Sequence, residues 1–281
     1  MSLFERGAQR ASGHHRFSSL IVAIVATVFA VGGLVAAPRS VEAAGAKVVI
    51  VVGPVGSLTP SWIDRGKRLA AQARSYGASV TEIYSPNATW GRVKSAAQGA
   101  KVFIYLGHGN GYPSPYGAFN GWSKDGLGLN AVAGQGHYNV KYWGESYIAR
   151  DIRFATNAVV ILNHLCYASG NSEPGMANPT KSVAIQRADN YANGFFRARA
   201  KAVFAEGLGN ASYVLYGLFR TSRTVQQIFW SAGTATRTYS FSFSSTRYPG
   251  ARALMDPYAP GKYYRSVVGA LGLTAGQWRS G

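Results

Sequence analysis

The 281-residue sequence contains a single cysteine, Cys166. A lone cysteine has no partner in its own chain, so an internal disulfide framework is excluded. Three interpretations of the thiol are left: an intermolecular bridge, a buried core side chain and a reactive nucleophile. Histidine is also scarce, with five in the chain, and the spacing of these residues is not that of a zinc site. We therefore expect no metal and no cofactor.

Acidic residues are few, with 11 Asp and Glu against 29 Lys and Arg, which gives a formal net charge of +18. Such a balance favours contact with anionic surfaces such as wall polymers, lipid head groups, nucleic acid or acidic substrates. The basic residues are scattered singly, and Lys67-Arg68 is the only adjacent pair. The sequence therefore predicts no specific nucleic-acid partner, but a solvated basic surface that can meet anionic cell-surface polymers.

Long apolar runs are absent except at the amino terminus, where residues 19–37 carry no charge. Arginines precede this run and small residues follow it, which is typical of a secretory signal peptide. We expect a signal peptide over residues 1–46 and a protein that is secreted or associated with the cell envelope. The alternative is an uncleaved membrane anchor, because the run is close to the length that spans a bilayer. Contact with a membrane is expected only in that case.

Beyond residue 46, short apolar runs rich in β-branched residues alternate with amphipathic stretches, as strands and helices do. Predicted strands cover residues 47–55, 79–84, 101–106, 158–165 and 201–205, and predicted helices cover 61–76, 89–97, 145–153, 181–200 and 223–230. This alternation indicates an α/β fold with a mostly parallel central sheet covered by helices on both faces. We expect one α/β domain over 47–235 and a C-terminal extension over 236–281.

A long segment, residues 112–144, interrupts the alternation. It is rich in Gly, Tyr, Asn and Trp and shows neither a helical nor a strand period. A loop of this length within a compact domain is usually functional or disordered, and its aromatic residues argue for order. We interpret it as an ordered flap beside a functional site.

Two of the predicted strands end in residues that can do chemistry. The run 101–106 leads into His108-Gly109, and the run 158–165 leads into Cys166. The carboxyl ends of parallel strands meet at one edge of a sheet, so neighbouring strands would bring the imidazole and the thiol together. A thiol is largely protonated at neutral pH, and a nearby imidazole is expected to raise the fraction of nucleophilic thiolate and then to protonate a leaving amine.

The segments KVFIYLGHG (101–109) and AVVILNHLC (158–166) resemble the caspase-like cysteine peptidases, clan CD, and are most similar to the gingipain, legumain and CHAT branches. The resemblance covers roughly residues 47–231. Leu165 stands where a small residue often precedes the cysteine, and the familiar Cys-x-Ser-Gly is lengthened here to Cys-Tyr-Ala-Ser-Gly170. The resemblance implies a caspase-like three-layer sandwich.

The resemblance also implies roles for individual residues. Cys166 would be the nucleophile, His108 the general acid and base, and the backbone N–H groups of Gly109 and Cys166 the oxyanion hole. The expected activity is that of an exported cysteine endopeptidase, which hydrolyses peptide or protein substrates through an acyl-enzyme thioester. Its preference for the residue before the scissile bond stays open.

Alternatives to this interpretation rest on other residues. His164 is a competing base, because residues two apart on a strand face the same side. We expect it to be structural, on the strand beneath the site, while His137 in the flap either binds substrate or is exposed. A catalytically silent caspase-like binding or wall-associated module is a second function. A third is a nucleotide- or sugar-binding protein that uses the glycine loops 53–56 and 107–111.

Overall fold

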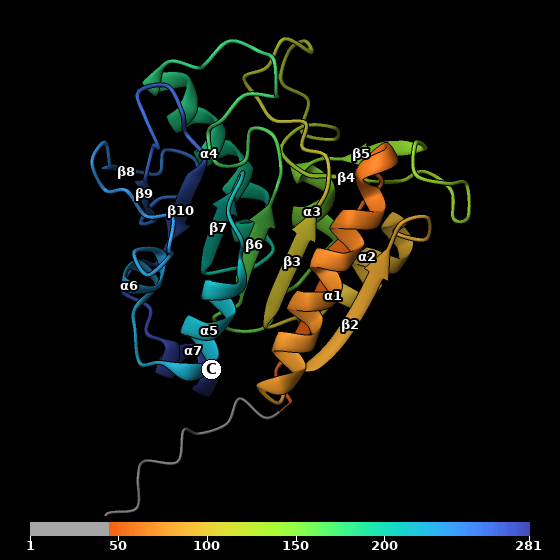
Figure 1. The fold of residues 1–281 in the computed structure, drawn as a ribbon, viewed down its shortest axis with the longest axis horizontal. Coiled ribbons are helices and arrows are strands. Elements are labelled where there is room, and N and C mark those ends of the chain that lie inside the picture. Colours follow the sequence, from red (N-terminus) through yellow and green to blue (C-terminus); the bar gives the residue numbers. More distant parts are fainter. Residues whose placement is uncertain (1–44) are drawn as a thin grey trace, which may run out of the picture. The chain divides into compact units, whose positions relative to one another are not determined.

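The computed structural model describes residues 45–281, which contain an eight-stranded sheet in the order β2-β1-β3-β6-β7-β10-β9-β8 (Figure 1). Apart from its last two residues, the expected signal peptide over 1–46 lies outside the described residues. The strands are β1 (Lys47–Val52), β2 (Ser79–Tyr84), β3 (Val102–Leu106), β6 (Val159–Asn163), β7 (Ala202–Glu206), β8 (Phe241–Ser244), β9 (Arg252–Met255) and β10 (Arg265–Gly269). Within this part of the chain, no helix combines the length and the apolar character that a bilayer span requires.

The sheet is mostly parallel. Its pairs are parallel from β2 through β1, β3 and β6 to β7, and antiparallel from β7 through β10 and β9 to β8. The predicted α/β class with a mostly parallel sheet is therefore confirmed. Residues 236–281, expected as an extension, supply the strands β8, β9 and β10 of this same sheet.

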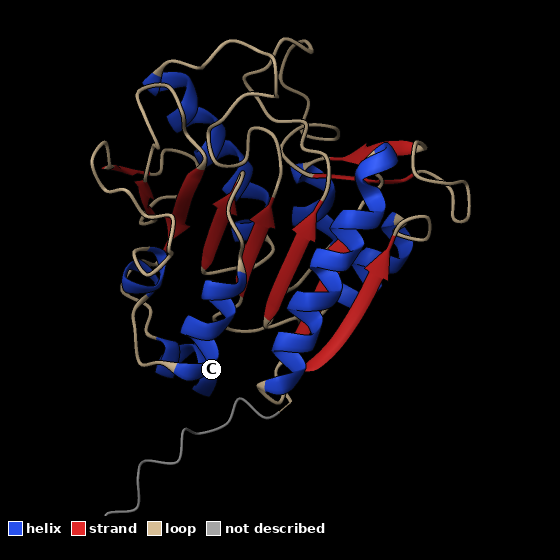
Figure 2. Cartoon of the chain, in the orientation of Figure 1, coloured by secondary structure: helices blue, strands red, loops and turns tan. Residues whose placement is uncertain are grey.

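Helices cover both faces of the sheet (Figures 1 and 2). They are α1 (Thr59–Ser75), α2 (Trp90–Ala97), α3 (Glu145–Asp151), α4 (Lys181–Arg197), α5 (Ser212–Arg220), α6 (Val225–Phe229) and α7 (Ala275–Ser280), with a short 3-10 helix, η1 (Gly56–Leu58), before α1. α1, α5, α6 and α7 pack on one face, and α2, α3 and α4 pack on the other.

Alternate side chains of a strand face opposite sides of a sheet, so this sheet has an apolar core on each face. In β1, Val49 and Val51 pack in the core covered by α2, α3 and α4, while Val48, Ile50 and Val52 pack in the core covered by α1, α5 and α7. Strands buried on both faces appear as continuous apolar runs. This is why β1 and β3 were recognisable in the sequence without any polar–apolar alternation.

The structure corrects the end of the fourth predicted strand. β6 ends at Asn163, so Cys166 lies in the turn that follows the strand. His164 has a φ of 61°, in the left-handed region, and at this residue the chain leaves the sheet. The expectation that His164 sits on the strand beneath the site is therefore wrong. Leu165 extended the predicted strand because it is apolar, but it is buried in the turn.

The flap segment contains a strand pair that the sequence analysis missed. β4 (Leu127–Asn130) and β5 (Val140–Trp143) form a separate antiparallel two-stranded sheet in which Gly128 lies opposite Tyr142. A Cβ atom at Gly128 would lie 3.1 Å from the Cβ of His108. Glycine within a strand often marks such a close approach, and it also removes the side chain that would have shown a period of two.

A buried ionic cluster joins the parallel and antiparallel parts of the sheet. Arg265 of β10 is opposite Glu206 of β7, and its Nε lies 3.1 Å from both carboxylate oxygens of Glu206. The same guanidinium donates to Asp256, with 2.5 Å between Nη1 and Oδ2, and to the Phe229 carbonyl oxygen at 2.8 Å. Buried charges persist when they are paired and hydrogen-bonded in this way. Gly207, which follows Glu206, reaches the pocket described below.

We predict that Arg265→Ala lowers the free energy of unfolding by about 3–5 kcal/mol, because it leaves two buried carboxylates without their cation. Arg74→Ala is the matched control, since Arg74 pairs with Glu82 at the surface with half of its side chain exposed, and it should lose about 0–1 kcal/mol. Urea denaturation of both variants measures the difference. Equal losses would show that the cluster does not hold the sheet together.

Candidate active site

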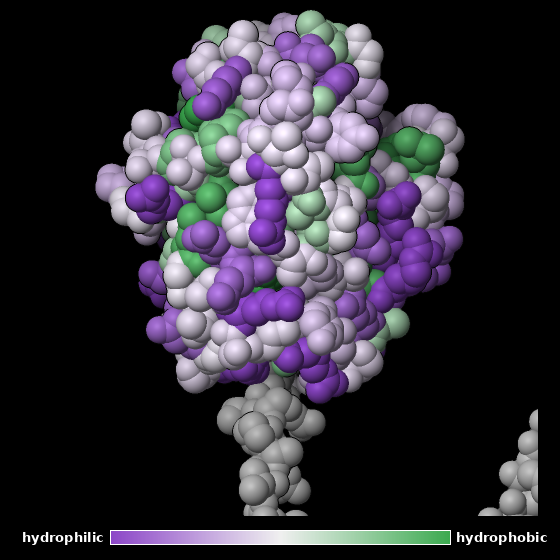
Figure 3. Space-filling view, turned by 60° about the vertical axis from the view of Figure 1, so that its left-hand side comes forward, coloured by the Kyte–Doolittle hydropathy of each residue, from purple (hydrophilic) through white to green (hydrophobic). Residues whose placement is uncertain are grey.

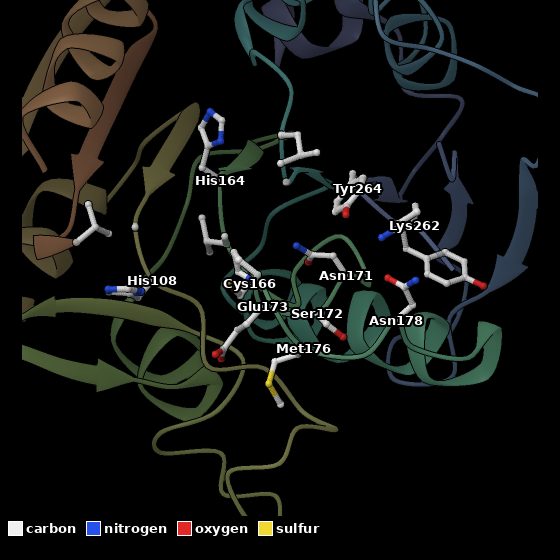
Figure 4. Close-up of a pocket in the computed structure, with 18 of the residues that line it drawn as sticks. His108, His164, Cys166, Asn171, Ser172, Glu173, Met176, Asn178, Lys262 and Tyr264 are labelled. Carbon is white, nitrogen blue, oxygen red and sulfur yellow. The ribbon is translucent and has the colours of Figure 1, made fainter. Parts of the chain in front are cut away.

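Loops that follow four parallel strands line a pocket of about 460 Å³ at the carboxyl edge of the sheet. The loop after β1 contributes Val55, the loop after β3 His108, the loop after β6 Cys166 and the loop after β7 Leu208. Figure 4 shows His108, Cys166 and Glu173 grouped toward one end of this pocket and Lys262 at the other. Parallel sheets commonly carry their functional groups at this edge.

The loops after β3 and β6 approach each other closely. β3 and β6 pair in parallel, as the sequence analysis required. A Cβ atom at Gly109 would lie 2.2 Å from the carbonyl oxygen of Cys166, and one at Gly111 would lie 2.2 Å from the Cβ of Tyr167. Only glycine fits at such distances. The structure thus brings His108, Gly109 and Cys166 to one pocket.

Tyr105 fixes the backbone that carries His108. Its hydroxyl oxygen lies 2.7 Å from the carbonyl oxygen of Gly128 and 3.1 Å from that of His108. The Gly128 amide in turn donates to this hydroxyl at 3.0 Å. The flap is therefore tied to the end of β3 through buried hydrogen bonds, and His108 projects from this support into the pocket.

A second hollow, also of about 460 Å³, lies on the flap side of Cys166. It shares His108, Cys166, Glu173 and Pro174 with the first pocket. Its own lining residues are Gly109, Asn110, Tyr116 and Tyr142. Cys166 consequently stands between two spaces, which suits a group that attacks a bond in the middle of a bound chain.

The backbone amides next to the thiol are available as donors. Within residues 45–281, neither the N–H of Gly109 nor that of Cys166 donates to a backbone carbonyl. Both residues lie outside the helices and strands. Amides left free beside a nucleophile can stabilise the negative charge that develops on an attacked carbonyl oxygen.

The thiol and the imidazole are both neutral at rest. Burial raises the pKa of the Cys166 thiol to about 11, and the nearby Glu173 carboxylate adds to the rise. Burial lowers the pKa of His108, against a smaller upward effect of Glu173. Each shift disfavours the charged form, so the thiolate expected from the sequence beside His108 is not favoured at neutral pH. A proton must therefore leave the thiol during its attack.

Glu173 is a residue of this site that the sequence analysis missed. It belongs to the loop that follows Cys166 and lines both pockets. Its carboxylate accepts from the hydroxyl of Tyr116 in the flap and from that of Tyr167, each at 2.8 Å. One signal was present: Glu173 is one of only 11 acidic residues, and it follows Cys166 closely in a polar loop.

Of the other two histidines of the described chain, His164 lines the first pocket together with His108, whereas His137 lines neither hollow. Nε2 of His164 lies 2.8 Å from Nη1 of Arg65, and because a guanidinium only donates, this nitrogen accepts and the ring is neutral. Burial and then Arg65 lower the pKa of His164 to about 4, so it is a poor base near pH 7. His137 lies on the other side of the β1 end, with Nδ1 2.9 Å from the hydroxyl oxygen of Ser85.

The residues that the structure describes contain no group of three His, Cys, Asp or Glu side chains placed to hold a metal ion. The glycine loop after β1, which the sequence offered as a nucleotide- or sugar-binding loop, is packed against other parts of the protein at Gly53. A Cβ atom at Gly53 would lie 2.3 Å from the carbonyl oxygen of Gly128 and 2.9 Å from the hydroxyl of Tyr105. Gly53 therefore has a packing role beneath the flap.

No protein-family model matches the sequence, and no curated protein matches it. Among solved structures, the crystal structure of a protein from Geobacter sulfurreducens is similar with a TM-score of 0.29 and 14% sequence identity, over 66% of this chain and 86% of that chain. A likeness this distant carries no weight for the function, which rests on the geometry of the site.

We predict that alkylation of Cys166 by iodoacetamide is slow at pH 7 and accelerates about tenfold per pH unit toward pH 10, because the reactive thiolate grows in this way below the raised pKa. The rate is measured from the intact protein mass in folded samples. Cys166 is the only cysteine, so the unfolded protein is the internal control. A rate that already reaches a plateau between pH 6 and 8 would reveal a preformed thiolate and contradict the neutral resting state.

Proposed function

We propose that this protein is an exported cysteine endopeptidase with a caspase-like α/β sandwich, in which His108 and Cys166 form the catalytic pair. The single observation that carries the proposal is the contact between the two loops. Gly109 lies so close to the Cys166 carbonyl oxygen that only glycine fits, and this holds the imidazole and the thiol at one pocket. The mostly parallel sheet with histidine after β3 and cysteine after β6 supports the resemblance to the caspase-like peptidases.

The chemistry follows from the neutral resting pair. As the sulfur attacks the scissile carbonyl carbon, neutral His108 accepts the thiol proton, and the imidazolium then protonates the departing amine. This leaves a thioester on Cys166. Water then attacks the thioester carbon while His108 again takes a proton, which returns to the sulfur as the carboxylic product leaves. A lowered pKa of His108 keeps the base form present well into mildly acidic solution.

The free amides of Gly109 and Cys166 would stabilise the oxyanion in both steps. The oxygen gains negative charge as the attacked carbon becomes tetrahedral, and donors that bind it more strongly at that stage lower the barrier and do not merely bind the substrate.

We place the protein outside the cytoplasm on the pattern of residues 1–46. Its charge of +18 suits an envelope rich in anionic polymers. Strongly hydrophilic side chains are scattered over the face seen in Figure 3, among small separate groups of apolar ones. Contact with wall polymers would then be diffuse and salt-sensitive, and peptide hydrolysis would belong to the pocket alone.

A second candidate is a catalytically silent binding module of the same fold. One observation favours it: the thiol pKa is raised, and no lysine or arginine of residues 45–281 contributes to lowering it. In that case the two hollows beside Cys166 would bind a peptide without cleaving it. Activity of the purified protein distinguishes the two functions.

For the active enzyme we predict that Cys166→Ala abolishes hydrolysis of a mixed fluorogenic peptide library. His108→Ala should lower kcat/KM by roughly 10²- to 10⁴-fold, because it removes the proton acceptor and donor. His137→Ala is the matched control histidine, because His137 lines neither hollow, and it should stay within a few-fold of wild type. Cleavage that survives Cys166→Ala, or equal losses in the two histidine variants, would refute the assigned roles.

A further inference from the structure

The charge of the site is opposite to the charge of the whole protein. The chain carries a large excess of basic residues, yet the hollow on the flap side of Cys166 is lined by Glu173 and by no lysine or arginine of the described chain. The first pocket has Glu173 at the His108 end and Lys262 at the far end (Figure 4). The fixed charge that acts on the Cys166 thiol is that of Glu173.

The carboxylate of Glu173 is held by neutral donors alone. The hydroxyls of Tyr116 and Tyr167 donate one hydrogen bond to each oxygen, both at 2.8 Å. A carboxylate oxygen can accept more than one hydrogen bond, so both oxygens keep capacity for a further donor. Five of the eight other carboxylates in residues 45–281 form ion pairs with arginines, namely Glu82, Glu145, Asp151, Glu206 and Asp256. Glu173 forms none within residues 45–281.

The protein's own cations near this carboxylate are already engaged. The Lys124 ammonium donates to Asn110, to Ser114 and to the Tyr116 carbonyl oxygen, at 2.9–3.0 Å. The Arg187 guanidinium donates to the backbone carbonyls of residues 113 and 171 and to the hydroxyl of residue 172. The donors of both cations are therefore turned toward groups other than the Glu173 carboxylate. A cation that completes the site must come from outside.

We infer that Glu173 binds the lysine or arginine side chain of a substrate residue that flanks the scissile bond. The inference rests on the proposed peptidase function, since it assumes a peptide lying across Cys166. Two tyrosine hydroxyls orient the carboxylate without neutralising it, as a preorganised receptor for an ammonium or guanidinium group requires. An arginine fork can engage both oxygens at once. The protein would thus select basic sites in its substrates although its overall charge favours acidic partners.

The kinetic test compares arginine with citrulline, which has nearly the same shape and no charge. Each residue is placed in turn at every position flanking the scissile bond of a fluorogenic peptide. At one of these positions the wild-type protein should prefer arginine by roughly 10- to 100-fold in kcat/KM, the worth of one charge-assisted hydrogen-bonded contact. Glu173→Gln should abolish the preference, since it keeps the shape and removes the charge.

Asp64→Asn is the matched control, because Asp64 is an exposed acid of α1 and lines neither hollow. This variant should keep the wild-type preference. If cleavage occurs with no preference for arginine at any position, or if Glu173→Gln keeps the preference, the assignment of Glu173 is overturned while the peptidase function stands.

A binding measurement separates this inference from catalysis. Agmatine, which carries a guanidinium group, is titrated calorimetrically into the Cys166→Ala protein and into Cys166→Ala with Glu173→Gln. Saturable binding that is lost in the double variant supports the cation site even if no peptide is cleaved, in which case only the peptidase function has failed. Equal binding to both proteins, or binding to neither, counts against the cation site. Circular dichroism confirms that both variants are folded.

Discussion

The close approach of two backbones is the constraint on which this site depends. The loop after β3 passes so near the loop after β6 that Gly109 and Gly111 leave no room for a side chain against Cys166 and Tyr167. A contact of this kind fixes relative position more firmly than flexible side chains could, because a packed backbone has few alternative arrangements. Because His108 and Cys166 belong to these two loops, the contact also fixes the positions of their backbones. Tyr105 adds the flap to the same rigid unit through Gly128.

The electrostatic character of the site follows from its burial. Partial desolvation raises the pKa of the Cys166 thiol and lowers the pKa of His108, so both groups favour their neutral forms at rest. The acidic side chain that acts on the thiol is that of Glu173, which Tyr116 and Tyr167 hold by hydrogen bonds. The negative charge of this carboxylate raises the pKa of the Cys166 thiol and so disfavours the thiolate, unless a cation offsets the charge. Binding of a basic side chain would therefore both position the substrate and ease the attack.

Much of this fold could be predicted from sequence, because the parallel strands are buried on both faces and stand out as apolar runs. The same criterion extended the predicted strand too far at Leu165, because an apolar residue buried in a turn cannot be told in the sequence from one buried in a strand. The strands β4 and β5 were missed because Gly128 carries no side chain to reveal a period. His108, Gly109 and Cys166 could be picked out as candidate site residues because each follows closely after an apolar run that predicts a strand. Glu173 could not be picked out in this way, because the hydroxyls of Tyr116 and Tyr167 that orient its carboxylate come close to it only in the folded chain.

The central claim is that Cys166, assisted by His108, attacks a peptide carbonyl. Its most direct test is to quench the protein within its first turnovers of a cleavable peptide at acidic pH and to map the product by mass spectrometry. We expect the acyl portion of the peptide as a thioester on the fragment that contains Cys166 in the wild-type protein, and no such adduct in His108→Ala. Peptide cleavage without any acyl group on Cys166, or an adduct that forms equally fast without His108, would contradict the claim.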